Sequence, residues 1–234
     1  MFSCEDFFSL HDFDHSSLWE KEGFVWSALI ALESYLKTYS YKIKIPIPDG
    51  VHFKNKDLIS IGEGTRIDPG VCIEGPCIIG KNCILRHGAF LRGHVILGDG
   101  CVVGHCSEIK NSILLNGAAA AHLCYVGDSI LGPSVNLGAG VKCANVRLDR
   151  REVSVDFQGK KIKTGLKKLG AILGVDVQIG CNCVLNPGTI VGQKSVVYPL
   201  LNIGGSIPPM SQVRALRSWV VEPRAEKILQ SLRT

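Results

Sequence analysis

Residues 61–109 read IGEGTRIDPGVCIEGPCIIGKNCILRHGAFLRGHVILGDGCVVGHCSEI, and their large aliphatic residues recur at every sixth position. Nine successive steps carry Ile61, Ile67, Ile73, Ile79, Leu85, Leu91, Leu97, Val103 and Ile109. Four positions after each comes a second set, compact in eight of nine cases: Thr65, Val71, Cys77, Cys83, Ala89, Val95, Cys101, Ser107 and Ile113. A period of six fits neither the 3.6-residue period of an amphipathic helix nor the alternation of a strand. It is typical of a chain that turns a corner every six residues, so that three hexads form one triangular coil.

The repeat returns toward the C-terminus. Its second run is Leu173, Ile179, Leu185, Val191, Val197 and Ile203. Between the runs, Val126, Leu131 and Leu137 keep the pattern with one five-residue step. Stacked coils pair their backbones in parallel sheets, so each coil covers the strand edges of its neighbour. The sequence therefore predicts an all-β chain that forms a parallel β-helix of hexapeptide repeats.

The segments on either side of the repeat predict short helices. Residues 17–40 carry apolar side chains at helical spacing, and we expect a helix that covers the open end of the coil. The repeat stops after Pro208 and Pro209, and residues 222–234 favour a second helix. The predicted divisions are an N-terminal lead-in, a coil and a tail, at residues 1–57, 58–208 and 209–234.

Cysteine usage and hydropathy favour a cytoplasmic protein. The ten cysteines suggest a disulfide framework, but the start MFSCEDFFSLHDFDH lacks the basic-then-apolar order of a secretory signal. Cys181 and Cys183 have no second pair or His partner at zinc spacing, so we expect no metal site. Most thiols are therefore interpreted as reduced core residues. The longest strongly apolar run, residues 24–32, is shorter than the ~20 residues of a membrane span, so no membrane partner is expected.

Two segments, residues 116–125 and 144–169, break the repeat and are candidates for function. The second predicts a protruding hairpin around Gln158 and Gly159. Its basic residues are Arg147, Arg150, Arg151, Lys160, Lys161, Lys163, Lys167 and Lys168. Against three acidic residues, the excess of +5 equals the net charge of the whole chain. A local positive field favours an anionic ligand such as phosphate or pyrophosphate, with a solvated loop as the alternative. Phe157 is its sole aromatic residue, so no stacking platform for nucleic acid is evident.

The strongest local signal is a set of motifs inside the coil. HLCYVGD (122–128) is followed by NLGAG (136–140) and Asn145, and is preceded by LR (91–92) and EIK (108–110). These motifs and their spacing resemble the acetyltransferase domain of the bifunctional N-acetylglucosamine-1-phosphate uridyltransferases. TGLKKLGAI (164–172) is similar to the archaeal-type branch of that family. The likeness covers roughly residues 58–208.

The resemblance implies a left-handed coil, a homotrimer, and acetyl transfer from acetyl-CoA to the amine of an amino-sugar 1-phosphate, most simply glucosamine 1-phosphate. It implies that His122 is the general base and that Asn145 lies near the acetyl-transfer centre. The residues implied to bind the acceptor are Arg92, Lys110, Tyr125, Asn136 and Arg151. The residues assigned to the coenzyme are Ala139, Lys167 and Lys168. The family has Lys where this chain has Arg151, and Arg is a poorer proton donor.

General chemistry agrees with these roles. An amine is mostly protonated near neutral pH, so its attack on a thioester needs a base, and His has a suitable pKa. No metal and no covalent acyl-enzyme are required. Cys124, next but one to His122, is therefore interpreted as a bystander, with a nucleophilic role as the alternative.

Two other functions stay open. In the bifunctional family a nucleotidyltransferase domain with a Gly-rich phosphate loop precedes the β-helix. Residues 1–57 contain no such loop, so we expect uridyl transfer to be absent. The chain could instead acylate a nucleotide-linked sugar, as the hexapeptide acyltransferases of lipid A synthesis do, or act as a non-catalytic scaffold. The motif spacing favours acetyl transfer, and a pure scaffold would need neither His122 nor Tyr125.

Overall fold

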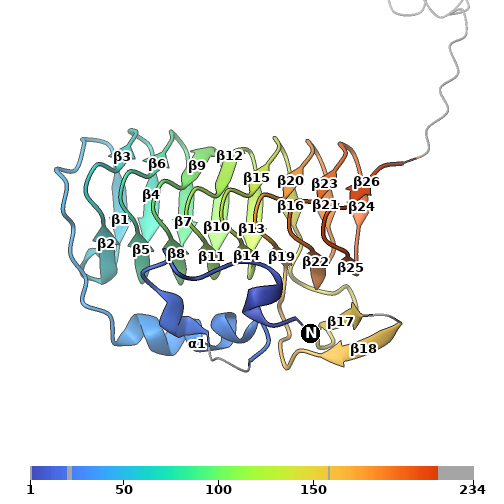
Figure 1. Ribbon diagram of the computed structural model, residues 1–234. Helices are drawn as coiled ribbons and strands as arrows, with labels where there is room; N and C mark the ends of the chain where they lie inside the picture. The colour runs from blue at the N-terminus through green and yellow to red at the C-terminus, as the bar shows by residue number, and fades with distance from the viewer. Residues whose placement is uncertain (1, 20–22, 158, 216–234) are drawn as a thin grey trace, which may run out of the picture.

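The computed structural model describes residues 2–19, 23–157 and 159–215 (Figure 1). Three eight-stranded parallel sheets form the sides of a left-handed coil, which confirms the predicted β-helix. Sheet A contains β2 (Ile59–Ile61), β5 (Cys77–Ile79), β8 (Val95–Leu97), β11 (Ser112–Leu114), β14 (Ile130–Leu131), β19 (Ala171–Leu173), β22 (Thr189–Val191) and β25 (Ser206–Ile207).

The other two sides alternate with sheet A along the chain. Sheet B contains β1 (His52–Lys54), β4 (Cys72–Glu74), β7 (Phe90–Arg92), β10 (Glu108–Lys110), β13 (Tyr125–Gly127), β16 (Lys142–Cys143), β21 (Val184–Leu185) and β24 (Asn202–Ile203). Sheet C contains β3 (Arg66–Ile67), β6 (Ile84–Leu85), β9 (Val102–His105), β12 (Ala119–His122), β15 (Asn136–Leu137), β20 (Gln178–Ile179), β23 (Val196–Val197) and β26 (Gln212–Val213).

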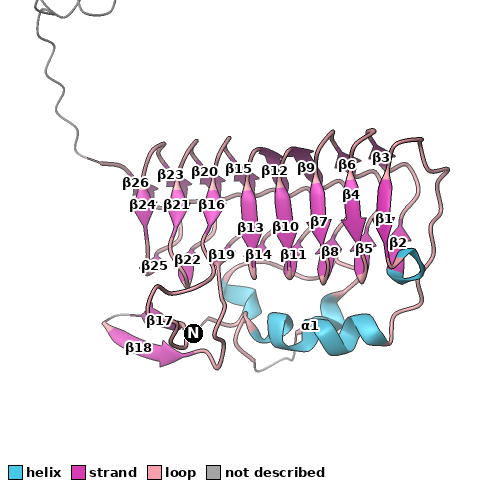
Figure 2. Cartoon of the chain, turned by 180° about the vertical axis from the view of Figure 1, so that it is seen from behind, coloured by secondary structure: helices cyan, strands magenta, loops and turns pink. Residues whose placement is uncertain are grey.

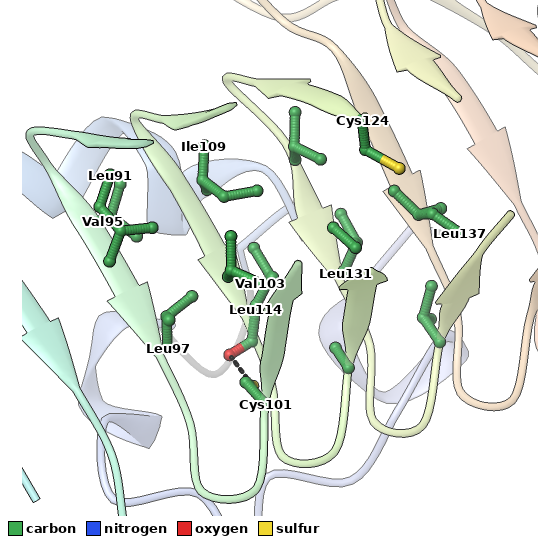
Figure 3. Close-up of a cluster of buried hydrophobic side chains, with 14 of the residues drawn as sticks. Leu91, Val95, Leu97, Cys101, Val103, Ile109, Leu114, Cys124, Leu131 and Leu137 are labelled. Carbon is green, nitrogen blue, oxygen red and sulfur yellow. Dashed lines mark hydrogen bonds between the residues drawn. The ribbon is translucent and has the colours of Figure 1, made fainter. Parts of the chain in front are cut away.

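The interior of the coil is built from the predicted hexad residues. All nine aliphatic residues of the first run are buried, and Figure 3 shows several of them stacked from coil to coil. The compact residues occupy the corners, where Cys83 and Cys101 donate their thiols to backbone carbonyls of the next coil. All ten cysteines lie in the described part of the chain, none forms a disulfide, and seven are buried.

The register differs from the prediction in one coil. Ile109 and Leu114 are consecutive inward residues only five positions apart, as are Val126 and Leu131. Each short step removes one residue from a corner between sheets B and A. As a result Ser112 takes the corner place that the hexad count gave to Ile113.

The prediction that residues 116–125 depart from the repeat is therefore wrong. This segment forms part of a coil like its neighbours. It contains β12, and Ala120 lies at its inward position with no exposed surface. A corner shortened by one residue moves the count without disturbing the coil, so the break that the sequence suggested lies upstream, between Ile109 and Leu114.

The outer face of sheet A carries a buried column of isoleucines. In parallel register these are Ile78, Ile96, Ile113, Ile130, Ile172 and Ile190, each at most 2% exposed. The N-terminal segment covers this column with α1 (Ser27–Lys37) and the 3-10 turns η1 (Cys4–Asp6) and η2 (Ser16–Leu18). A third turn, η3 (Lys56–Leu58), precedes sheet A.

A helix therefore forms within residues 17–40 as predicted, but its predicted position at the open end of the coil is wrong. Its apolar side, including Ala28, Leu32 and Leu36, packs against the side of the coil, below sheet A in Figure 2. Fully burying one isoleucine contributes roughly 1.5–3 kcal/mol, so the column of isoleucines is a strongly stabilising docking surface for this helix. The second predicted helix, at residues 222–234, lies outside the described residues.

The predicted hairpin forms from β17 (Ser154–Phe157) and β18 (Lys160–Lys163), paired antiparallel. Val153 and Val155 are fully buried in the same cluster as the isoleucine column. The hairpin therefore packs against the N-terminal segment, and its lysines are exposed. Among the described residues, no helix has the length and apolar character to cross a membrane, and no group of three potential metal ligands is present.

We expect Ile113→Ala to lower the free energy of unfolding by about 2–5 kcal/mol, because it opens a cavity in the middle of the isoleucine column. Denaturant unfolding measures this loss. Ile30→Ala on α1 is the matched control: Ile30 is 58% exposed, and its loss should stay within about 0.5 kcal/mol. Equal losses in the two variants would mean that the column is not what holds the N-terminal segment.

Candidate active site

The sequence-predicted site residues divide between sheet B, the corner after sheet C, and the basic loop. Arg92, Lys110 and Tyr125 lie on neighbouring strands of sheet B, and Asn145 follows the next strand, β16. His122 ends β12 at the corner where the chain passes from sheet C to sheet B. These five residues lie on or next to four successive strands of sheet B, and we refer to this stretch of the coil as the polar region.

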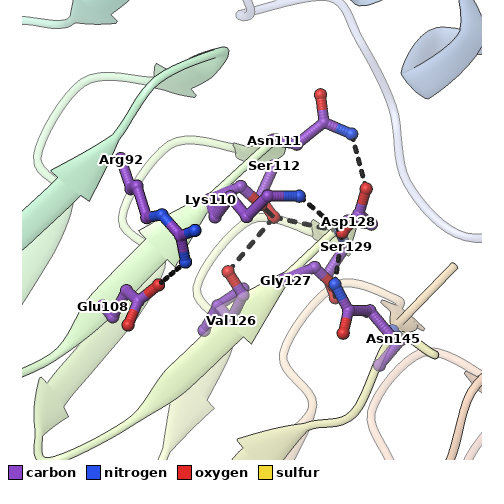
Figure 4. Close-up of polar contacts among 11 residues, drawn as sticks. Arg92, Glu108, Lys110, Asn111, Ser112, Val126, Gly127, Asp128, Ser129 and Asn145 are labelled. Carbon is purple, nitrogen blue, oxygen red and sulfur yellow. Dashed lines mark hydrogen bonds and ion pairs between the residues drawn. The ribbon is translucent and has the colours of Figure 1, made fainter. Parts of the chain in front are cut away.

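Two ion pairs organise the sheet B side of this region (Figure 4). Arg92 Nη1 donates to Glu108 Oε1 at 2.9 Å, and Lys110 Nζ lies 3.3 Å from Asp128 Oδ2. The first pair is partly exposed, with Glu108 at 32% of its side-chain surface, whereas the Asp128 side chain is 6% exposed. Both cations that the resemblance assigns to acceptor binding are thus paired with carboxylates.

Asp128 is the centre of the polar network. Its carboxylate accepts hydrogen bonds from Lys110, from Asn111 Nδ2 at 2.8 Å, and from Asn145 Nδ2. A buried carboxylate requires such donors, because an unpaired charge out of water is costly. Asp128 sits at the second shortened corner with φ of 48°, a conformation that Asp tolerates better than most residues. The shortened corner therefore aims this carboxylate at three side chains of neighbouring coils.

Tyr125 lies over a glycine that keeps room for it. A Cβ atom at Gly127 would lie 2.6 Å from Tyr125 Oη and 2.7 Å from Asn145 Nδ2. Burial raises the pKa of the Tyr125 phenol, and the carboxylates of Glu108 and Asp128 raise it further. The phenol therefore stays protonated at neutral pH and can donate a hydrogen bond to a ligand.

His122 is exposed and belongs to a column of histidines. Its neighbour one coil earlier is His105, and the His105 ring stacks on His87 at 5.5 Å between centroids. One coil later, Gly140 N–H donates to the His122 carbonyl at 3.0 Å, which brings Ala139 beside the predicted base. Leu123 follows with φ of 53° and 56% exposure, an uncommon conformation for a large side chain that is often found at functional sites.

Cys124 faces the interior of the coil (Figure 3). It is 3% exposed, and its thiol donates to the carbonyls of His122 and Gly138. Burial raises the pKa of this thiol, so it remains protonated. These observations favour the bystander interpretation over a nucleophilic one.

Four predicted residues do not join this region within one chain. Asn136 is exposed on sheet C, a different side of the coil. Arg151, Lys167 and Lys168 are exposed on the loop between β16 and β19. Near Arg151, the Arg147 guanidinium holds the pKa of Asp149 well below its usual range.

Sequence reasoning assigned no role to three further polar residues of this region. Glu108 and Asp128 stand inside quoted motifs, but their contacts reach across coils. Lys142, the register partner of Tyr125, was not singled out. The coil length of 17 residues, which separates Tyr125 from Lys142, was the available signal.

We expect Asp128→Asn to destabilise the fold by about 1–3 kcal/mol, because its amide cannot accept from Lys110, Asn111 and Asn145 together. Glu108→Gln, which breaks the more exposed ion pair, should cost about 0–1 kcal/mol. Denaturant unfolding of the two variants makes the comparison. A smaller loss for Asp128→Asn than for Glu108→Gln would contradict the central place of Asp128.

Comparison with known proteins places this region in a family. Residues 73–202 match the family described as the GMPPB C-terminal domain. A bifunctional sugar-1-phosphate nucleotidylyltransferase/acetyltransferase of Sulfurisphaera tokodaii is 44% identical over 85 residues, which are 36% of this chain and 21% of that protein. The chain thus matches about a fifth of that relative's length. The uncharacterized acetyltransferase YaiX of Escherichia coli is 31% identical over 192 residues, 81% of this chain and 84% of that protein.

Among solved structures, a mutant of perosamine N-acetyltransferase from Caulobacter crescentus, in complex with CoA and GDP-perosamine, is 18% identical. It has a TM-score of 0.29 over 75% of this chain and 59% of that chain, too low to compare the two sites. The match over residues 73–202 and the relative of similar length both cover the coil and its polar region. The chain belongs to the family of the GMPPB C-terminal domain, the hexapeptide β-helix that is related to the acetyltransferase domain of the bifunctional sugar-1-phosphate enzymes.

Proposed function

We propose that the chain transfers the acetyl group of acetyl-CoA to the amine of an amino-sugar 1-phosphate, most simply glucosamine 1-phosphate, in the cytoplasm. The observation that carries this proposal is that an exposed His122 ends the strand directly before β13, which carries Tyr125, while Asn145 follows the neighbouring strand of sheet B, β16. The motifs that supply these residues are those of the acetyltransferase resemblance.

In the proposed mechanism, His122 Nε2 or Nδ1 takes a proton from the acceptor amine as the amine nitrogen attacks the acyl carbon. The coenzyme supplies the acetyl group as a thioester when it is bound. The Asn145 side chain hydrogen-bonds both Asp128 and Tyr125, and these two contacts orient its amide dipole toward the oxygen that becomes negative. His122 then returns the proton to the departing sulfur, so the amide forms, the thioester breaks and the charges balance.

The small side chain of Ala139 leaves the backbone beside His122 open to a bound thioester. We assign Lys167 and Lys168, both exposed on the basic loop, to the phosphates of the coenzyme. Arg92 and Lys110 are assigned to the acceptor phosphate, which has to compete with Glu108 and Asp128 for them.

We further propose that the chain acts as a homotrimer. Asn136 and Arg151 lie away from the His122 region in one chain, and a threefold assembly would bring them to the site of a neighbouring copy. A closed threefold assembly would place each site between two coils.

We expect the wild type to convert acetyl-CoA and glucosamine 1-phosphate to N-acetyl product, and His122→Ala to lose about 10²-fold or more of kcat because the amine loses its base. Product is measured by mass spectrometry, since the cysteines would react with thiol reagents. His87→Ala is the matched control, in the same histidine column but two coils away, and should keep its activity.

Other outcomes would favour the alternatives. Product with an acyl carrier protein and a nucleotide-linked sugar, but none with acetyl-CoA, would favour an acyltransferase that acts on nucleotide-linked sugars. The basic loop is the feature that suits the pyrophosphate of such a sugar. No product from any donor would favour a scaffold.

Cys124→Ser should leave kcat unchanged, because the thiol points into the coil and stays protonated. The same assay measures it, with circular dichroism to show that the variant is folded. A folded but inactive Cys124→Ser would sink the direct-transfer mechanism in favour of an acyl-cysteine.

A further inference from the structure

Sheet B presents a third cation beside the two that the resemblance assigns. The outward residues Tyr125 on β13 and Lys142 on β16 are register partners, so Lys142 continues the side that holds Arg92 and Lys110. Lys142 Nζ donates to the Gly140 carbonyl at 2.6 Å. Within residues 2–19, 23–157 and 159–215, no carboxylate lies within ion-pair distance of Lys142.

The positive charge of Lys142 is therefore in excess on the outer side of sheet B. Arg92 and Lys110 contribute two positive charges, and their partners Glu108 and Asp128 contribute two negative ones. Without Lys142 the cluster is neutral. A phosphate monoester carries about −1.5 to −2 charges at pH 7, so a neutral cluster would offer it little net attraction.

Contacts with Gly140 also connect Lys142 to the backbone of the predicted base. Its ammonium contacts the Gly140 carbonyl, and Gly140 N–H donates to the His122 carbonyl at 3.0 Å. On its other side is Tyr125, whose protonated phenol can donate to the same ligand. An ammonium has three N–H donors, so the contact with Gly140 leaves two for a ligand.

We propose that Lys142 binds the anionic group of the acceptor, a phosphate monoester, and is the cation that gives this site its net attraction for phosphorylated sugars. The part that concerns the acceptor rests on the proposed acetyl transfer. Anion binding at Lys142 stands on the ion pairs and contacts of sheet B alone.

The first test uses inorganic phosphate as the probe and needs no activity. Phosphate should raise the Tm of the wild type, because a ligand that binds only the folded state stabilises it. Lys142→Gln, which keeps a polar side chain but removes the charge, should lose that rise. Lys194→Gln, an exposed lysine at the corner between sheets A and C, is the matched control and should keep it.

The rival location for phosphate is the basic loop, so a Lys167→Gln and Lys168→Gln double variant is measured alongside. It should keep the rise in Tm. The proposal is overturned if phosphate does not stabilise the wild type, if it stabilises Lys142→Gln equally, or if the double variant is the one that loses the effect.

The second test separates binding from chemistry. Lys142→Gln should raise KM for glucosamine 1-phosphate by about 10- to 100-fold, since one charge-assisted hydrogen bond is lost, with kcat little changed. KM for unphosphorylated glucosamine should not change. An equal rise for both sugars would overturn the assignment, whereas a wild type without transferase activity would refute the proposed function and leave the phosphate result to judge Lys142.

Discussion

The structure depends on one constraint: each coil must lie one hydrogen-bond spacing, about 4.8 Å, from the next at every point of its circuit. Large side chains then fit inward only at the middle of each side, and compact ones at the corners. Where the backbone of the next coil comes closest, no side chain fits at all. At Gly104 an added Cβ would collide with the Ala121 backbone, so even alanine is excluded there. Because the coils are held so tightly, side chains on successive coils have fixed positions, and a polar site can be built from residues far apart in the chain.

The shortened corners turn this regular scaffold into a site. Asn111 and Asp128 are the residues that occupy the two shortened corners. Both adopt the left-handed conformation, with φ of 46° and 48°. The second corner directs a carboxylate back along the outer side of sheet B, where it meets Lys110 and Asn145 (Figure 4). A coil of full length would carry an extra residue at this position. The polar network thus depends on a deletion rather than on an insertion, unlike the loop that interrupts the coil between β16 and β19.

The sequence predicted the coil well because its rule is local: each inward residue is set by its own hexad. Handedness came from the family resemblance, since the spacing is the same for either hand. The prediction was wrong where a residue's role depends on a distant segment. Ile113 was counted as a corner residue because a shortened corner leaves no mark in a six-residue count. The place of α1 could not be predicted, because the isoleucine column is visible only once the coils are in register. For the same reason the motifs made His122 and Tyr125 site candidates, but did not show the contacts of Asp128 or the unpaired charge of Lys142.

The buried isoleucine column also constrains the order of folding. The N-terminal segment is synthesised before the coil, yet its contacts are with coils made much later. Phe7 accepts a backbone hydrogen bond from Val175, and Phe2 and Phe7 share a cluster with Ile190. Most of its apolar surface has no partner on the ribosome until those coils exist. Coils that are already complete can stack in order, since each contacts its neighbours. The first residues of this chain are thus among the last to find their place, and their docking reports that the whole coil has formed.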